Sequence, residues 1–152
     1  MAQPVSPSII EFSDLSAASR ELGLEPPPDG KTSIELAILP GEYAPPQGCI
    51  LLAARAEEYI GCVALRPLED RICEMKRLYV IPGFRGQKIG RALVRGIIDE
   101  ARLGGYEHMR LDTIATMTAA KSLYLSLGFR SIKPYRYNPL DNPTYFELDL
   151  RQ

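Results

Sequence analysis

The segment from Leu78 to Leu93 constrains the fold of this chain more than any other. It reads as an apolar strand, a short turn rich in arginine and glycine, and then an amphipathic helix. The first backbone N–H groups of a helix have no partner inside the helix, and the positive end of the helix dipole lies beside them. A phosphate binds well at such a helix start. The segment therefore predicts a phosphate-binding turn between a strand and a helix.

The residues of this turn support that interpretation. Gly86 and Gly90 have no Cβ, so the backbone can approach a ligand closely. Positive charge is added by three side chains: Arg85, Lys88 and Arg91. The glycines do not have the spacing of a dinucleotide fingerprint, and no Gly-Lys-Ser/Thr follows them as in a P-loop. The turn is therefore expected to bind a phosphate-bearing cofactor of another kind.

This turn resembles the acyl-CoA pyrophosphate loop of the GNAT superfamily of N-acyltransferases, which reads Gln/Arg-x-x-Gly-x-Gly/Ala between a strand and a long helix. Arg85, Ile89 and Gly90 match, whereas Lys88 stands where the family usually has glycine. A lysine there can still offer its backbone N–H if its φ is negative. The resemblance implies acetyl-CoA as the cofactor, bound by Arg85, Gly86, Gln87, Lys88, Ile89, Gly90 and Arg91.

Two further segments carry the same resemblance, which covers most of the chain. Glu74–Val80 is similar to the family's cofactor strand, and Ala120–Phe129 is similar to its motif Ala-x-x-Leu-Tyr-x-x-x-Gly-Phe. Met117 stands where many members carry an asparagine that binds the pantetheine arm. The resemblance implies backbone contacts to the pantetheine arm and the thioester oxygen from Leu78, Tyr79 and Val80.

Tyr124 is the candidate general acid, because it occupies the tyrosine position of the second motif. A phenol with a pKa of about 10 can return a proton to a departing thiolate, whose pKa is about 8.5 by analogy with cysteine. The alternative is an aromatic side chain that only packs in the core at helical spacing.

Glu74 is the candidate general base. An alkyl ammonium has a pKa of about 10.4, so neutralising it at pH 7 costs about 4.6 kcal/mol, and a carboxylate can take its proton directly or through water. Because alternate residues of a strand share a face, we expect Glu74 to point toward the cofactor, on one face with Ile72, Lys76, Leu78 and Val80. The alternative is a surface carboxylate paired with Lys76 or Arg77.

Other polar residues are weaker candidates. Asp112 and Thr113 end a predicted strand and either face the acceptor or make structural hydrogen bonds. His108, the only histidine, is expected to be solvated or to cap a strand. A proline-rich loop lines the acceptor pocket or packs without a role; its candidates are Tyr135, Arg136, Tyr137 and Asn138.

The pattern predicts an α/β fold with a mixed, mostly antiparallel sheet of six or seven strands flanked by helices, as in the GNAT fold. We expect strands over Ser8–Phe12, Cys49–Ala54, Tyr59–Arg66, Ile72–Val80, Met109–Thr113, Phe129–Ile132 and Thr144–Leu150. We expect helices over Leu15–Leu24, Lys31–Leu39, Gly90–Arg102 and Thr116–Leu127. One domain spanning residues 1–152 fits this length.

Composition limits the partners. The net charge is −1, so no overall basic field attracts nucleic acid. No apolar run approaches the roughly 20 residues of a membrane span. Met1–Pro7 lacks the features of a signal peptide, so we expect a cytoplasmic protein. Cys49, Cys62 and Cys73 lack metal-ligand spacing and are expected to be reduced strand residues, with no metal bound.

Taken with the resemblance, these features predict an N-acetyltransferase that moves an acetyl group from acetyl-CoA to a primary amine by direct transfer in a ternary complex. The departures at Lys88 and Met117 leave open an acyl-CoA sensor without turnover. A protein–protein interaction module, in which the glycine-rich turn is only a tight connection, is the other alternative. The sequence identifies neither the acceptor amine nor the oligomeric state, and a homodimer stays open.

Overall fold

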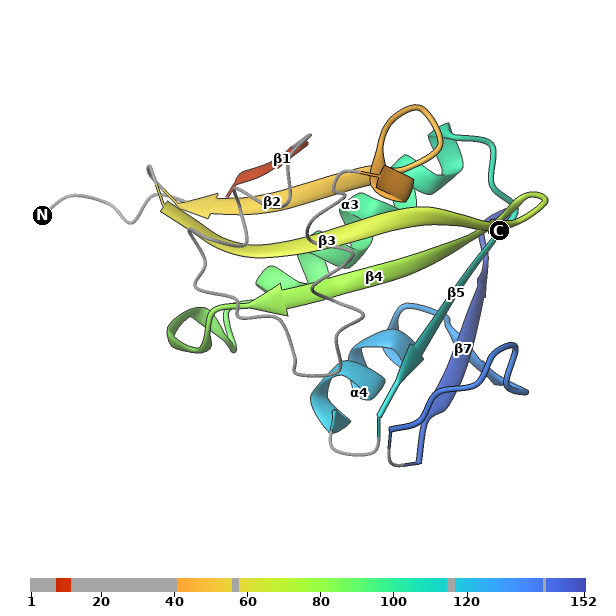
Figure 1. The fold of residues 1–152 in the computed structure, drawn as a ribbon. Helices are drawn as coiled ribbons and strands as arrows, with labels where there is room; N and C mark the ends of the chain where they lie inside the picture. Colours follow the sequence, from red (N-terminus) through yellow and green to blue (C-terminus); the bar gives the residue numbers. More distant parts are fainter. Residues whose placement is uncertain (1–7, 12–40, 56–57, 115–116, 141) are drawn as a thin grey trace, which may run out of the picture.

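The computed structural model describes residues 8–11, 41–55, 58–114, 117–140 and 142–152. The strands of these residues form one seven-stranded sheet in the order β1-β2-β3-β4-β5-β7-β6 (Figure 1). The strands are β1 (Ser8–Glu11), β2 (Cys49–Arg55), β3 (Glu58–Glu69), β4 (Ile72–Val80), β5 (His108–Thr113), β6 (Arg130–Ile132) and β7 (Thr144–Asp149). The helices are α3 (Ile89–Leu103) and α4 (Thr118–Ser126), with short 3₁₀ helices η1 (Gly41–Tyr43) and η2 (Pro82–Phe84).

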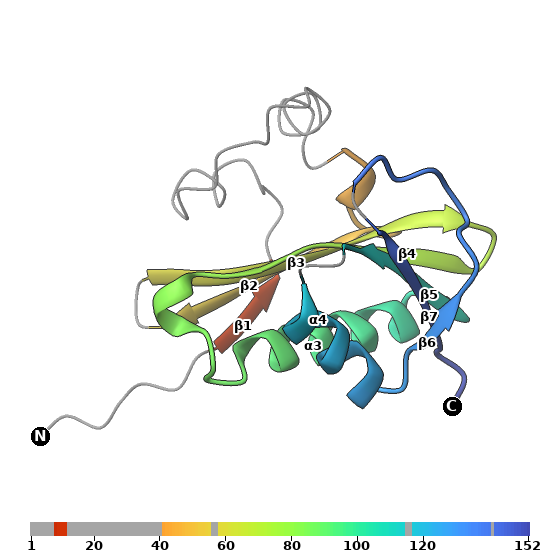
Figure 2. The ribbon, with the colours of Figure 1, turned by 90° about the horizontal axis from the view of Figure 1, so that it is seen from below.

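The sheet is mixed, because β4 and β5 are parallel and the other neighbouring strands are antiparallel. Helices α3 and α4 lie on one face of the sheet, while η1 and the β6–β7 connection lie on the opposite face (Figure 2). Of the described helices, none is long and apolar enough to cross a membrane. The predicted fold class is confirmed.

The main core lies between the sheet and the helices. Helix α3 buries an apolar stripe that recurs every three or four residues: Ile89, Leu93, Val94, Ile97, Ile98 and Ala101. These side chains pack on strand residues that include Leu51, Val63 and Met75. Each large apolar side chain contributes about 1.5–3 kcal/mol when fully buried, so this stripe fixes α3 against the sheet.

Most predicted boundaries hold to within three residues, and β4 matches Ile72–Val80 in full. Strand β3 continues through Pro67 to Glu69, where a break was expected. A register irregularity between Pro67 and Glu69 explains this, since a proline is tolerated at a bulge. The helices expected over Leu15–Leu24 and Lys31–Leu39 lie outside the described residues.

Strand β4 contains a β-bulge that changes which side chains share a face. Cys62 pairs with Tyr79 and Ala64 with Lys76, so two residues of β4 stand opposite one residue of β3. Arg77 takes a positive φ of 62° at this point. A bulge shifts the alternation of faces by one residue.

The prediction that Glu74 shares a face with Leu78 and Val80 is therefore wrong. Leu78 and Val80 pack against the core on the helix side, whereas Tyr79 packs against a smaller cluster on the opposite face. Before the bulge the order is reversed, since Cys73 and Met75 belong to the helix-side core. Glu74 thus lies on the face of the sheet that carries the β6–β7 connection.

Candidate active site

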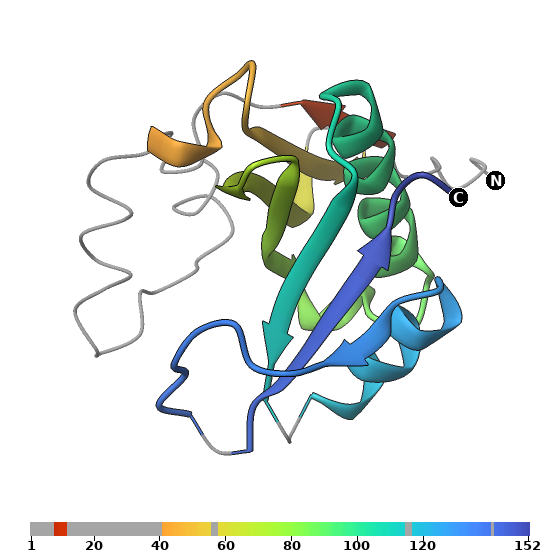
Figure 3. The same cartoon turned by 90° about the vertical axis from the view of Figure 1, so that its right-hand side faces the viewer.

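Strands β4 and β5 pair over a short distance and then separate. Their ladder joins Ile72 to His108, Cys73 to Met109 and Glu74 to Arg110. Beyond this point β4 stays paired with β3 and β5 with β7, and the two strands diverge (Figures 1 and 3). Within the described residues, the facing edges of the diverging parts carry no ladder between them. Such edges can form backbone hydrogen bonds with an extended ligand.

The predicted phosphate-binding turn lies at the far end of this splay. Gly86 takes a φ of 82°, and a Cβ added to it would meet no atom within 4 Å. Helix α3 begins at Ile89 with no side chain capping its first N–H groups. An open, uncapped helix start of this kind fits a pyrophosphate group.

Lys88 occupies the N-cap of α3 with a φ of 64°. We expected Lys88 to offer its backbone N–H if its φ is negative, but its φ is positive. This left-handed conformation costs a non-glycine residue roughly 1–2 kcal/mol. A glycine would take this φ without steric cost, whereas Lys88 takes it at an energetic cost.

Two of the predicted cations of the turn also make contacts within the protein. The Arg85 Nε donates to the carbonyl of Val80 at 2.9 Å, and its guanidinium lies over the Tyr79 ring at 5.4 Å. The Arg91 Nη2 donates to Ser126 Oγ at 2.7 Å and so links α3 to α4. These contacts fix the side chains at the two ends of the turn.

A fourth cation supports the turn from β2 and was missed in the sequence analysis. The Arg55 Nη2 donates to Gln87 Oε1 at 2.7 Å, and its guanidinium lies 5.2 Å from the centre of the Phe84 ring. Arg55 is 32 residues from Gln87, so no local pattern could reveal this contact.

Tyr124 lies in the helix-side core, together with Leu78 and Val80. Its ring packs against Phe129 at 5.6 Å and Phe146 at 6.0 Å, measured between ring centres. Burial raises the pKa of Tyr124 to about 12, so the phenol keeps its proton throughout the neutral range. Tyr124 therefore does pack in the core, as the alternative to a catalytic role predicts. The role of general acid stays a prediction.

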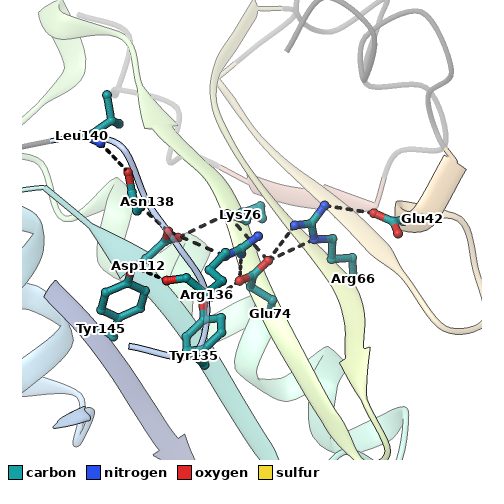
Figure 4. A network of polar contacts seen from close by, with 10 residues as sticks. All are labelled: Glu42, Arg66, Glu74, Lys76, Asp112, Tyr135, Arg136, Asn138, Leu140 and Tyr145. Carbon is teal, nitrogen blue, oxygen red and sulfur yellow. Dashed lines mark hydrogen bonds and ion pairs between the residues drawn. The ribbon is translucent and has the colours of Figure 1, made fainter. Parts of the chain in front are cut away.

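Glu74 is completely buried within a group of charged side chains (Figure 4). Its Oε1 accepts from Arg66 Nε at 3.0 Å and Nη2 at 2.9 Å, and lies 3.6 Å from Lys76 Nζ. Its Oε2 accepts from the Tyr135 hydroxyl at 2.6 Å and pairs with Arg136. The alternative of a surface carboxylate is wrong about exposure but right about the partner Lys76.

Asp112 lies beside Glu74 on the same face and joins the group. Its Oδ1 lies 3.2 Å from Lys76 Nζ, and its Oδ2 accepts from Asn138 Nδ2 at 3.0 Å. Arg136 Nε lies 3.8 Å from Asp112 Oδ2. We call this group the charged cluster; it consists of Arg66, Glu74, Lys76, Asp112, Tyr135, Arg136 and Asn138.

The structure thus brings together three of the four loop candidates, whereas Tyr137 is 85% exposed. Thr113 points to the other face, where its Oγ1 is buried without a hydrogen-bond partner among the described residues. Arg66 was not predicted as a site residue. It lies on β3, and only the pairing of β3 with β4 places it opposite Glu74.

Known proteins are similar to this chain in sequence. An uncharacterized N-acetyltransferase of Schizosaccharomyces pombe is 45% identical over 119 residues, which are 76% of this chain and 72% of that protein. The N-acetylaspartate synthetase of Danio rerio is 37% identical over 100 residues, or 64% of this chain but only 36% of that protein.

Solved structures share the fold. A GNAT-family acetyltransferase from Staphylococcus aureus aligns with a TM-score of 0.75 and 24% identity, covering 95% of this chain and 99% of that chain. An acetyltransferase structure from Salmonella typhimurium, solved with its cofactor acetyl-CoA, aligns with a TM-score of 0.67 and 20% identity over 95% and 94% of the two chains. The family model described as acetyltransferase (GNAT) family matches residues 15–129. The chain belongs to the GNAT family of acetyltransferases.

Proposed function

We propose that this acyltransferase moves an acetyl group from acetyl-CoA to a primary amine by direct attack in a ternary complex. The observation that carries the proposal is the splay of β4 from β5, which runs from the charged cluster to the open helix start of α3. The Salmonella neighbour with bound acetyl-CoA supports the choice of cofactor. The Danio rerio relative is named N-acetylaspartate synthetase, after an acetylated amine, and this name supports the choice of acceptor.

The residues present fit a CoA ester. The first N–H groups of α3 and the cations around the turn would hold the pyrophosphate. The edge of β4 from Leu78 to Val80 has no strand beside it, although its Val80 carbonyl accepts from Arg85 Nε, and it would bind the pantetheine arm, with a backbone N–H near Tyr79 facing the carbonyl oxygen. The bound cofactor supplies a thioester, whose carbonyl carbon bonds to the amine nitrogen while its bond to sulfur breaks.

Tyr124 would protonate the sulfur that leaves. Its pKa of about 12 makes it a weaker acid than an ordinary phenol. The same burial raises the basicity of a thiolate formed beside it, because a low-dielectric site disfavours any unpaired negative charge. Proton transfer then releases a neutral thiol and moves the negative charge to the Tyr124 phenolate, which regains its proton from water.

The contacts of Glu74 support a positioning role more than direct proton removal. Both carboxylate oxygens already accept bonds from Arg66, Tyr135 and Arg136, and the side chain has no exposed surface. A carboxylate surrounded by cations is a poor proton acceptor. We therefore infer that Glu74 holds the cations in place, and that the acceptor nitrogen loses its proton to water.

Thiol release tests the proposal. Acetyl-CoA and a panel of amines are incubated with the protein, and free thiol is measured. The chain's own cysteines are buried, and burial raises the pKa of Cys62 and Cys73 to about 12, which keeps the background signal low. A sensor would be stabilised by CoA but release no thiol with any amine. An interaction module would not be stabilised by CoA at all.

A further inference from the structure

We propose that the acceptor is a small primary amine that also carries a carboxylate, and that Arg66, Lys76 and Arg136 bind this carboxylate. The inference rests on the proposed function and names the substrate class of the same site. It would make the charged cluster the acceptor site.

The three cations come from three separate elements and meet at one place. Arg66 lies on β3, Lys76 on β4, and Arg136 on the β6–β7 connection, and all three contact Glu74 (Figure 4). Glu74 is the last residue of β4 that pairs with β5. The cations therefore gather where the splay begins, which is the end away from the phosphate-binding turn.

The charges of the cluster are arranged by depth. The side chains of Glu74 and Asp112 are 0% and 11% exposed, whereas those of Arg66, Lys76 and Arg136 are 19%, 24% and 30% exposed. The carboxylates of Glu74 and Asp112 thus lie below the three cations, whereas a third carboxylate, the 64% exposed Glu42, pairs with Arg66 Nη1 at 2.9 Å, so a ligand carboxylate would compete with Glu42 for Arg66. Guanidinium groups have several donors in a planar fork that matches a carboxylate.

The cluster is held in this form before any ligand binds. Both Arg110 and Arg136 lie over the Tyr135 ring at 5.5 Å, and Tyr135 packs edge-on against Tyr145 at 5.3 Å. Asn138 bonds to Asp112, and its Oδ1 accepts from the backbone N–H of Leu140. Little side-chain entropy is lost on binding when the partner groups are already ordered.

The partly buried cations also act on the charge of the acceptor. Like charges nearby disfavour an ammonium group and favour its neutral form, which is the form that attacks a thioester. An acceptor with several positive charges would be repelled. An amine with a carboxylate is attracted through the carboxylate and loses its ammonium proton more readily.

Matched acceptors test this inference. Glycine, alanine, aspartate, glutamate and phenylalanine are each compared with the corresponding α-carboxamide, and spermidine serves as a polycation. Thiol release from acetyl-CoA is measured, with rates compared at equal concentrations of the neutral amine. We expect KM for the best amino acid to be at least about tenfold lower than KM for its amide.

A charge deletion assigns the effect to the cluster. Arg136→Gln should raise KM for the amino acid at least about tenfold and leave KM for the amide unchanged. Lys133→Gln removes a charge from an exposed position on the same connection and should change neither value. The melting temperature of each variant is measured, and Lys76→Gln replaces Arg136→Gln if the latter does not fold.

The outcomes separate the two proposals. Thiol release that is equal for acids and amides, or faster with spermidine, overturns the carboxylate site and leaves the acetyltransferase proposal intact. A charge deletion that raises both KM values equally also overturns it. If CoA stabilises the protein but no amine releases thiol, the proposed function fails and the inference fails with it.

Discussion

The Tyr135 hydroxyl donates a 2.6 Å hydrogen bond to Glu74 Oε2 across 61 residues of sequence. This bond joins the β6–β7 connection to the residue at which β4 leaves β5. Burial raises the pKa of Tyr135 well above its usual value, so the hydroxyl stays protonated and can donate at neutral pH. The connection is therefore fixed to the sheet at the candidate acceptor site.

Removal of this hydroxyl should destabilise the protein. Tyr135→Phe keeps the ring but deletes a donor to a buried charge, which costs about 1.5–3 kcal/mol in the free energy of unfolding. Urea denaturation measures this quantity. The matched control is Tyr137→Phe, whose ring is 85% exposed and which should differ from the unmodified protein by less than about 0.5 kcal/mol. Equal stability of the two variants would contradict the bond.

Tyr124→Phe should impair chemistry without impairing stability. Among the described residues the Tyr124 hydroxyl has no hydrogen-bond partner, so its loss should change the free energy of unfolding little. If the phenol protonates the leaving sulfur, kcat should fall about 10²–10⁴-fold while the affinity for CoA is kept. Unchanged turnover at saturating acceptor would falsify the assignment and leave Tyr124 as a core residue.

The pH profile of the unmodified enzyme provides a second check on Tyr124. A phenol with the ordinary pKa of about 10 would begin to lose its proton above about pH 9, and turnover would fall. Burial raises the pKa of Tyr124 to about 12, so this loss is shifted to higher pH. We expect kcat to show no decline between about pH 8 and 10. A decline in that range that is absent from Tyr124→Phe would contradict the raised pKa.

Glu74→Gln distinguishes positioning from proton removal. The variant removes the buried partner of three partly buried cations, and breaking a buried pair costs up to about 3–5 kcal/mol in the free energy of unfolding. If Glu74 positions the cations, acetyl transfer should fall by the same factor at every pH, with a raised KM for the acceptor. If Glu74 is the base, transfer should recover at high pH, where the amine is already neutral. We expect the first result, measured as kcat and KM against pH.

Much of the fold could be predicted because its signals are local. The apolar strand, the glycine-containing turn and the α3 stripe lie next to one another in sequence, and each has its own periodicity. The face of Glu74 could not be predicted, because the bulge at Arg77 depends on pairing with β3. Gly61 permits that pairing, since a Cβ there would lie 2.8 Å from the Tyr79 carbonyl oxygen.

The residues of the candidate site could be predicted only in part, because the pairing of strands brings together segments that are distant in sequence. The loop residues Tyr135, Arg136, Tyr137 and Asn138 were expected either to line an acceptor pocket or to pack without a role, and only the folded sheet brings three of them beside Glu74. Arg66 and Arg55 contribute through strand order, which places them beside Glu74 and Gln87. A single sequence carries no record of such distant contacts.

Lys88→Gly should stabilise the protein. Lys88 has a φ of 64°, a region that glycine occupies without steric cost. Relief of this strain, partly offset by the greater entropy of glycine in the unfolded chain, should add about 0.5–1 kcal/mol to the free energy of unfolding. The stabilisation by CoA should be kept if the backbone N–H is the phosphate donor. Lys88→Ala is the control, because it removes the charge and retains the strain; equal stability of the two variants would contradict the argument.

Arg55→Ala should weaken CoA binding through the turn. The Arg55 side chain holds Gln87 and lies over Phe84, so its removal loosens the backbone that faces the phosphates and deletes a nearby positive charge. We expect the Kd for CoA, measured by calorimetry, to rise about tenfold, the equivalent of about 1.4 kcal/mol.

Pantetheine, which lacks the pyrophosphate, provides the internal control for this variant. Its binding should be unaffected by Arg55→Ala, because the pantetheine arm is expected on β4 and not on the turn. Arg95→Ala, at an exposed position of α3, removes an equal charge and should leave both ligands unchanged. If Arg55→Ala weakens CoA and pantetheine alike, Arg55 supports the fold as a whole. A loss confined to CoA would assign Arg55 to the phosphate-binding turn.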